Sequence, residues 1–242
     1  GKKDRIIVTI RQNDNGIKSL VVLDEQESSF SSYTHPQNFF PSRHYVLHIR
    51  NIYLSSDSDE ILSKANCYKK VIQIKRPDYL ATDHAKSEDA VIHWLNNELI
   101  TGPPDIVVML EPTAPLRKPS DIDSAIKVFL EKKLDSLFSG AFLEDFLIWK
   151  RDQKNNLISV NYDFKNQGPR QMREPDIVEN GALYLFTPAC ILENSNRFGG
   201  EIGHFKNDFW QSFEIDSPDD WKFVELIYSS YINYLYDDLD LK

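Results

Sequence analysis

The sequence predicts an α/β protein built around a mainly parallel sheet. Short apolar runs alternate along the chain with amphipathic segments, which is typical of strands joined by helical crossovers. The run at 105–110 (DIVVML) is almost purely apolar, as expected for a central strand buried on both faces. A chain of 242 residues is long enough to give one such domain a full core.

Each element follows from its local pattern. We expect strands at 5–10, 51–54, 71–74, 105–110, 137–139, 181–186 and 212–215. We expect helices at 58–67, 84–99, 121–130, 188–193 and 217–228. Asp57 or Ser58 would cap the first helix and Ser217 the last, because short oxygen-bearing side chains accept hydrogen bonds from the first helical N–H groups.

Two segments break this pattern. Residues 25–43 have no apolar period and are interpreted as a long loop. Residues from about 142 to 179 lose the regular alternation and are interpreted as an arm inserted into a single domain spanning 1–242.

Composition excludes several classes of function. The 28 Lys and Arg residues against 37 Asp and Glu give a net charge of −9, which argues against non-specific binding to nucleic acid or an anionic membrane. No apolar run reaches the roughly 18 residues of a membrane span. Cys67 and Cys190 lack CxxC spacing, so neither a structural zinc site nor a disulfide framework is indicated. The opening Gly1-Lys2-Lys3 lacks an initiator Met and a secretory apolar segment, so Gly1 is interpreted as an expression remnant and a cytoplasmic location is expected.

Polar clusters follow three of the expected strands, at 11–16, 111–117 and 214–216. In an open parallel sheet, ligands bind at the carboxyl ends of the strands. The first cluster has neither a dinucleotide nor a Walker fingerprint, and the second, with two prolines, is also compatible with a rigid turn. Glu214 and Asp216 are two residues apart in an expected strand, so both would share one face. Such a pair suits Mg²⁺ together with substrate phosphates, although a solvated acidic face fits equally well.

Six motifs occur in a fixed order along the chain. They are 10–16 (IRQNDNG), 55–61 (SSDSDEI), 76–87 (RPDYLATDHAKS), 110–117 (LEPTAPLR), 170–171 (RQ) with 180–184 (NGALY), and 213–216 (FEID). Together they resemble the motifs of the cytidylyltransferases that activate sialic acids and related 3-deoxy-ulosonic acids as CMP-sugars. The match is collinear from about residue 52 to 226, with residues 5–16 added.

The resemblance implies a Rossmann-like nucleotidyltransferase fold, a three-layer α/β/α arrangement with a mainly parallel sheet and a dimerisation arm at about 142–179. It implies transfer of CMP from CTP to a sialic-acid-like 3-deoxy-nonulosonic acid, an acidic nine-carbon sugar, with release of pyrophosphate and Mg²⁺ as the cofactor. The expected assembly is a homodimer with no nucleic acid or membrane partner.

The same resemblance assigns site residues. The expected catalytic residues are Arg11, Asn15 and Asp216, and the expected metal ligands are Glu214 and Asp216. The nucleotide would contact Arg11, Gln12, Asn13, Gly16, Arg76, Ala85 and Ser87. The sugar would contact Glu111, Arg170, Asn180, Tyr184 and Phe198. Arginine suits these roles because its planar guanidinium donates paired hydrogen bonds to phosphate and carboxylate.

The chain departs from the family pattern at positions that bear charge. Asp14, Asn15 and Leu20 replace a serine and two lysines of the family loop, and Glu111 replaces a glutamine. Two hypotheses follow. The protein is an active cytidylyltransferase with an altered substrate, such as a sugar with a basic or differently acylated group facing Glu111, or it is a catalytically deficient binding or assembly module.

Overall fold

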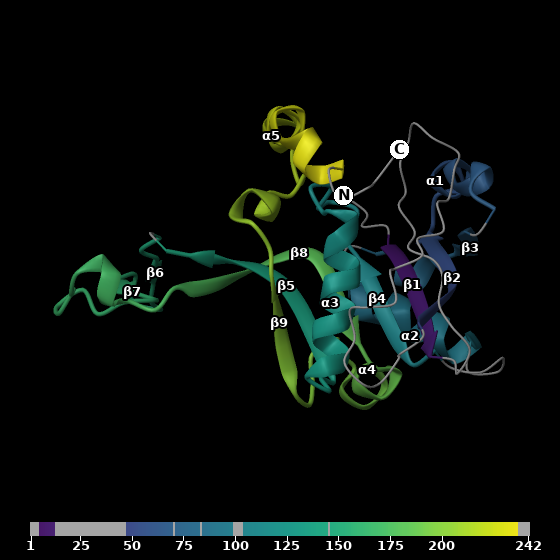
Figure 1. Cartoon of the computed structure of the whole chain (residues 1–242), viewed down its shortest axis with the longest axis horizontal. Helices are drawn as coiled ribbons and strands as arrows, with labels where there is room; N and C mark the ends of the chain where they lie inside the picture. The colour runs from purple at the N-terminus through teal and green to yellow at the C-terminus, as the bar shows by residue number, and fades with distance from the viewer. Residues whose placement is uncertain are drawn as a thin grey trace, which may run out of the picture.

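The computed structural model describes residues 5–12, 47–69, 71–82, 84–98, 104–144 and 146–236. A seven-stranded sheet with the order β3-β2-β1-β4-β8-β5-β9 forms its centre (Figure 1). Its strands are β1 (Arg5–Gln12), β2 (Leu47–Ser56), β3 (Val71–Lys75), β4 (Ile106–Leu110), β5 (Ser136–Leu143), β8 (Asp176–Phe186) and β9 (Ile202–Lys206). The helices are α1 (Asp59–Lys64), α2 (Ser87–Glu98), α3 (Pro119–Glu131), α4 (Pro188–Asn194) and α5 (Pro218–Tyr236).

Five of the seven strands run in one direction, and β1 and β8 run in the other. The pairs β2–β3 and β5–β9 are parallel, while β1 and β8 are antiparallel to both of their neighbours. The expected mainly parallel α/β sheet is therefore confirmed in strand direction. The carboxyl ends of β2, β4 and β9 lie toward the side of the sheet that is uppermost in Figure 1, beside α1 and α5, whereas β5 runs out to the left.

The direction of β1 corrects one expectation. The strand expected at 5–10 is present, but Ile6 pairs with Leu110 at the carboxyl end of β4, and Ile10 pairs with Ile106 at its start. Arg11 therefore lies about 17 Å along the sheet from Leu110, at the opposite edge. The expectation that the segment after this strand shares an edge with 111–117 is wrong for Arg11 and Gln12. A short apolar run pairs equally well in either direction, so its sequence does not specify which one.

Two layers of apolar side chains cover the sheet. Alternate residues of β4 point to opposite faces, and all five are buried, as expected for a central strand. On one face, the buried stripe of α3 contacts this strand and β8; it comprises Ile122, Ala125, Ile126 and Phe129. On the other face, Val107, Met109 and Phe186 pack against α2 and α4. The result is the three-layer α/β/α arrangement that the sequence predicts.

Helix boundaries follow the expected caps. Ser58 Oγ accepts from the backbone N–H of Ile61 at 3.4 Å and begins α1, which continues through the 3₁₀ turn η1 (Ala65–Cys67). Ser217 Oγ accepts from the N–H of Asp220 at 3.2 Å and begins α5. Both caps confirm the sequence-based expectation. No helix within the described ranges combines the length and apolar character required to cross a membrane.

Further elements differ from the sequence-based expectation. The strand expected at 212–215 is absent, because the segment forms the 3₁₀ turn η4 (Phe209–Ser212) followed by irregular chain. Conversely, β9 was not expected, since its sequence IGHFK mixes apolar, glycine and basic residues. The segment 25–43 lies outside the described residues.

The ends of β5 and β8 continue beyond the sheet and carry a projection made of residues 146–175 (Figure 1). It holds the two-stranded sheet of β6 (Trp149–Arg151) and β7 (Leu157–Ser159) and the 3₁₀ turn η3 (Arg170–Met172). Asn161 stabilises its base, because its amide donates to the Phe146 carbonyl at 2.8 Å and to Asp176 Oδ2 at 2.6 Å. The projection therefore has its own hydrogen-bonded framework.

Replacing Ile191, which is 0% exposed between α4 and the sheet, should lower the free energy of unfolding. We expect Ile191→Ala to cost about 2–5 kcal/mol, since the remaining side chains cannot fill the cavity. The matched variant Ile202→Ala changes a side chain that is 51% exposed and should cost less than about 1 kcal/mol. Chemical denaturation of both variants measures the difference, and equal losses would contradict this description of the core.

Candidate active site

Three motifs that are far apart in sequence meet around the carboxylate of Glu214. Thr113 Oγ1 donates to Glu214 Oε2 at 3.3 Å, and the backbone N–H of Ile215 donates to the Thr113 carbonyl at 2.8 Å. Gly181 in β8 has a φ of +61°, and a Cβ atom there would lie 2.5 Å from Glu214 Oε1. Glycine adopts this backbone conformation without steric cost, and a side chain at residue 181 would have to displace the Glu214 carboxylate. The 110–117, 180–184 and 213–216 motifs therefore form one site.

A buried carboxylate holds these segments together. Asp121, in the first turn of α3, accepts at Oδ2 from the backbone N–H of Lys118 at 3.0 Å, from Asn207 Nδ2 at 3.2 Å and from Gln211 Nε2 at 2.7 Å. Gln211 Nε2 also donates to the Leu116 carbonyl at 3.1 Å. The chain that leads from β9 to Glu214 is thus fixed to the turn that follows β4.

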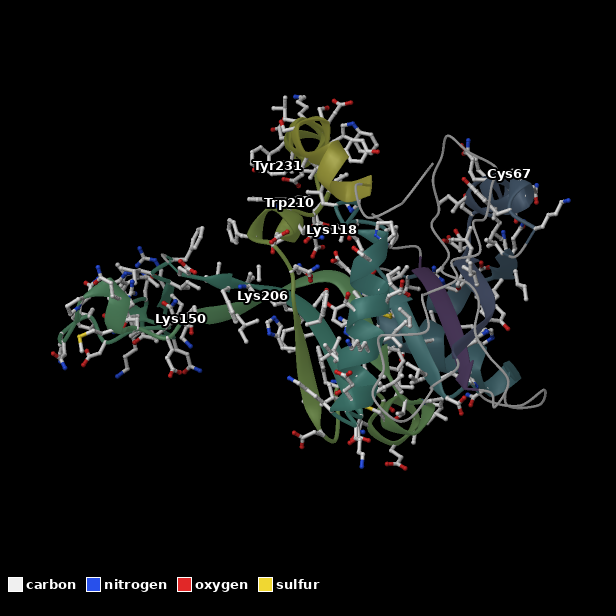
Figure 2. The ribbon with its side chains drawn as sticks, in the orientation of Figure 1. Cys67, Lys118, Lys150, Lys206, Trp210 and Tyr231 are labelled. Carbon is white, nitrogen blue, oxygen red and sulfur yellow. The ribbon has the colours of Figure 1, made fainter. Side chains whose placement is uncertain are left out.

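The same junction extends outward to α5. Lys118 Nζ lies 2.8 Å from Asp208 Oδ2 and 5.6 Å from the centre of the Trp210 ring. Trp210 stacks on Tyr231 of α5, with ring centres 4.8 Å apart, and the three side chains lie side by side in Figure 2. These contacts attach the final helix to the edge of the sheet that carries the site.

Arg117 connects the turn after β4 to β8. Its Nη1 donates to the Ala182 carbonyl, one residue after Gly181, and to the Ala114 carbonyl at 3.4 Å. Burial lowers the pKa of Arg117 to about 10, while the charges of Asp121 and Glu111 oppose that shift. The guanidinium therefore remains a cation at neutral pH and supplies positive charge beneath the site.

Glu111 does not stand alone as an anion. It is buried, and its Oε1 lies 3.5 Å from Arg197 Nη1. Arg197 Nε lies 3.4 Å from Oε1 of Glu88, in the first turn of α2. The carbon of the same guanidinium lies 4.1 Å from the centre of the Tyr184 ring. One arginine thus bridges the start of α2, the end of β4 and the middle of β8.

Tyr184 and Phe198, both expected at the sugar, are neighbours. Their ring centres are 6.0 Å apart in an edge-on arrangement, and Tyr184 donates its hydroxyl hydrogen bond to Glu179. Burial raises the pKa of Tyr184 well above its usual range, while the positive charge of Arg197 acts in the opposite direction. The hydroxyl is therefore a proton-bearing donor at neutral pH.

Asn180 is 1% exposed and precedes the glycine that meets Glu214. Its Oδ1 accepts from Ser139 Oγ at 2.7 Å and from the backbone N–H of Ala182 at 3.3 Å. Its Nδ2 has no hydrogen-bond partner among the described residues. A buried amide donor without a partner is costly, and it suits an oxygen acceptor on a ligand.

Three residues expected at the nucleotide lie between β3 and the start of α2, at the same edge of the sheet as Glu111. Arg76, directly after β3, is buried and donates from Nη2 to the Ser55 carbonyl at 2.6 Å, and its backbone N–H donates to the Ser56 carbonyl at 2.9 Å. Ala85 donates its N–H to the Thr82 carbonyl at 3.1 Å, and Ser87 begins α2. These residues share the edge with Glu111, and Glu88 links them to it through Arg197.

Other expected site residues lie elsewhere. Arg11 and Gln12 are at the opposite edge of the sheet, where they pair with His48 and Leu47. Arg170 lies in η3, within the projection. The remaining loop positions, Asn13, Asp14, Asn15, Gly16 and Leu20, lie outside the described residues.

Glu214 and Asp216 are not arranged as expected. Their segment is irregular, so the strand that would have placed both on one face is absent. Glu214 faces Gly181, whereas Asp216 is exposed and its backbone N–H donates to Asp220 Oδ2 at 3.1 Å at the start of α5. No cluster of three metal-ligating side chains occurs in the described ranges. Two hard carboxylates still match Mg²⁺, which takes its remaining ligands from phosphate and water.

These features define a class of protein, an α/β protein with its candidate site at the carboxyl ends of the parallel strands. A solved structure titled as CMP:2-keto-3-deoxy-manno-octonic acid synthetase complexed with CTP has the same fold, with a TM-score of 0.50 at 11% identity over 74% of this chain and 80% of that one. No protein-family model matches the sequence.

Curated relatives narrow the class to a family. Post-translational flagellin modification protein B of Campylobacter coli is 30% identical over 189 residues, which cover 74% of this chain and 77% of that protein. CMP-N,N'-diacetyllegionaminic acid synthase of Campylobacter jejuni is 30% identical over 186 residues, with the same two coverages. The chain belongs to the acylneuraminate (CMP-nonulosonic acid) cytidylyltransferase family.

Sequence reasoning missed Arg197 altogether. It lies in the irregular segment after α4, where a single arginine carries no periodic or motif signal. Its only indication was its position beside Phe198, which was expected at the sugar. The contacts of Arg197 become visible only when α2, β4 and β8 are placed together.

Adding a methyl group at residue 181 should disturb the site directly. Gly181→Ala would place Cβ against Glu214 and force a left-handed backbone conformation on alanine, so we expect a loss of about 1–3 kcal/mol in the free energy of unfolding. Gly168→Ala is the matched control, because a Cβ there meets nothing within 4 Å. Denaturation curves compare the two, and an unaffected Gly181→Ala would contradict the close approach of Glu214.

Asp121 should make stability depend on pH. Burial raises the pKa of its carboxyl, against the opposing hydrogen bonds from Gln211 and Lys118. A group with a raised pKa contributes stability below its unfolded pKa and loses that contribution as the pH rises through its folded pKa. Relative to Asp121→Asn, the wild type should therefore lose stability between about pH 4 and its raised pKa, and then stay level.

Urea denaturation of both proteins over about pH 4–8 measures this difference. Asp123→Asn, an exposed carboxylate on the same helix, is the matched control. A wild type that gains stability relative to Asp121→Asn as the pH rises would show that hydrogen bonding, not burial, dominates at this carboxyl.

Proposed function

We propose that the protein transfers CMP from CTP to a sialic-acid-like 3-deoxy-nonulosonic acid and releases pyrophosphate. The observation that carries this proposal is the meeting of Thr113, Gly181 and Glu214 at one edge of the sheet. Membership of the cytidylyltransferase family supports the same reaction. A relative in Campylobacter jejuni is named as a CMP-N,N'-diacetyllegionaminic acid synthase, which supports an acidic, acylated sugar as the acceptor.

In this reaction the anomeric hydroxyl oxygen of the sugar forms a bond to the α-phosphorus, and the hydroxyl proton passes to solvent. The bond from that phosphorus to the oxygen bridging to the β-phosphorus breaks, and pyrophosphate leaves. Such a displacement depends mainly on positioning the reactants and neutralising charge, because the phosphates carry their negative charge throughout. Rigid attachment of the site to α3 and β8 suits this requirement.

Glu214 and Asp216 would hold the magnesium ion of the proposed reaction. Their oxygens are hard ligands, and Gly181 leaves room for the Glu214 carboxylate at the strand. Bound Mg²⁺ would supply positive charge to the triphosphate. Thr113 would orient the Glu214 carboxylate toward the ion, because its hydroxyl donates a hydrogen bond to that carboxylate.

The sugar would lie against Asn180, Tyr184 and Phe198. Asn180 Nδ2 offers a buried donor, and the two aromatic rings offer an apolar wall. Arg170, in the projection, is the proposed partner of the sugar carboxylate. The nucleotide would lie on the other side, near Arg76, Ala85 and Ser87.

We also propose that the projection is the dimerisation arm. Its described part exposes large apolar side chains that a monomer would leave in water. They include Phe146, Trp149, Leu157, Phe164 and Met172, the last of which is 81% exposed. A second copy of this chain would cover them in a symmetric dimer.

The cytoplasm is the proposed location, supported by the free thiols of the chain's two cysteines, Cys67 and Cys190.

One observation favours the second candidate, a catalytically deficient binding module. β1 takes the backbone of Arg11 to the edge opposite Glu111, away from the described site. The negative charge of the phosphates would then have to be neutralised by Mg²⁺ and by arginines that already form hydrogen bonds or ion pairs within the protein.

A direct assay distinguishes the two candidates. The protein is incubated with CTP, Mg²⁺ and either N-acetylneuraminic acid or N,N'-diacetyllegionaminic acid, and pyrophosphate release is followed. We expect turnover that falls at least about tenfold in Glu214→Gln, because charge at the metal is lost. Glu225→Gln, an exposed residue on α5, is the matched control. If neither sugar leads to pyrophosphate release, and CTP still binds in a thermal-shift assay, the protein is the catalytically deficient binding module.

A further inference from the structure

Arg197 is a cation that faces Glu111 within the described residues. Its Nη1 lies 3.5 Å from Glu111 Oε1, and its Nε lies 3.4 Å from Glu88 Oε1. The three side chains are enclosed, with exposures of 20% for Arg197, 13% for Glu88 and 10% for Glu111. The charge of Glu111 is therefore already met within the protein.

The guanidinium is held on several sides. Its carbon lies 4.1 Å above the Tyr184 ring and 6.0 Å from the Phe198 ring. A cation on an aromatic face between two carboxylates is well placed and loses little freedom on ligand binding. This cluster connects α2, on the nucleotide side, with Tyr184 and Phe198 on the sugar side.

Arg197 also keeps capacity for a ligand. Its Nη1 is buried, yet it has no hydrogen-bond partner among the described residues, because the approach to Glu111 is an ion pair without hydrogen-bond geometry. A buried guanidinium nitrogen without an acceptor is costly. An oxygen of the substrate, such as an acyl carbonyl, would satisfy it.

We propose that Arg197 determines sugar specificity: it cancels the charge of Glu111 and offers Nη1 to a carbonyl oxygen, so that the site selects a neutral acylamido substituent and rejects a basic one. This inference rests on the proposed function and specifies its substrate class. It excludes the hypothesis that Glu111 faces a basic group of the sugar, because Arg197 already lies there.

The test is a change of specificity. N-acetylneuraminic acid is compared with its N-glycyl analogue, whose terminal amine is protonated at neutral pH. The wild type should prefer the acetyl sugar. In Arg197→Gln the exposed charge of Glu111 would favour the amine, so the ratio of kcat/KM values for acetyl over glycyl should fall about 10- to 100-fold. The KM for CTP should change much less.

Rescue separates a specificity role from a merely structural one. Adding Glu111→Gln to Arg197→Gln removes the unpaired carboxylate, and the preference for the acetyl sugar should return to within about threefold of the wild type. Arg197→Lys keeps the charge and should keep the preference, even if Arg197→Gln folds poorly. Lys127→Gln, which removes one positive charge from the surface of α3, is the matched control.

An unchanged acetyl-to-glycyl ratio in Arg197→Gln, or no recovery in the double variant, would overturn the inference. Pyrophosphate release by the wild type would still support the proposed function. If the wild type binds acidic sugars in calorimetry without turnover, the same ratio is measured from dissociation constants. A wild type that neither binds nor turns over any acidic sugar overturns both proposals.

Discussion

The buried carboxylate of Asp121 is the contact on which the site depends. It sits at the start of α3 and accepts from groups on the turn after β4, on the chain after β9 and on η4. Three segments therefore meet at one anion, and the chain that follows η4 can deliver Glu214 to Thr113. A carboxylate buried in this way is stable only when all its donors are present, so the junction forms as a unit.

The cations around the site are held in place by the protein before any substrate binds. Arg76 is bound to the end of β2, Arg117 to the carbonyl of Ala182, and Arg197 to two glutamates. An acidic protein with a net charge of −9 therefore concentrates enclosed cations at one edge of its sheet. Charges fixed in place before binding need no reorganisation during the reaction, which is how a protein stabilises phosphoryl transfer most effectively.

Local patterns predicted much of the fold for identifiable reasons. Five consecutive apolar residues in β4 required burial on both faces, and Ser58 and Ser217 began helices because their hydroxyls accept from the following turn. The expected strand at 212–215 failed because η4 is held by Gln211, whose partners Leu116 and Asp121 are about a hundred residues away in sequence. The direction of β1 depends on its neighbours, so its own residues could not predict it.

By itself, the sequence determined the α/β class, the order of most elements and the motifs that indicated a cytidylyltransferase. The class and the elements depend on the period of apolar residues and on short caps, which act within a few positions along the chain, whereas the motifs indicated the family by resemblance. Only the tertiary structure decided that Glu214 approaches Gly181, that Arg11 lies at the far edge, and that Arg197 neutralises Glu111. Each of these depends on distances between segments that are remote in sequence, and electrostatic and steric effects act through space.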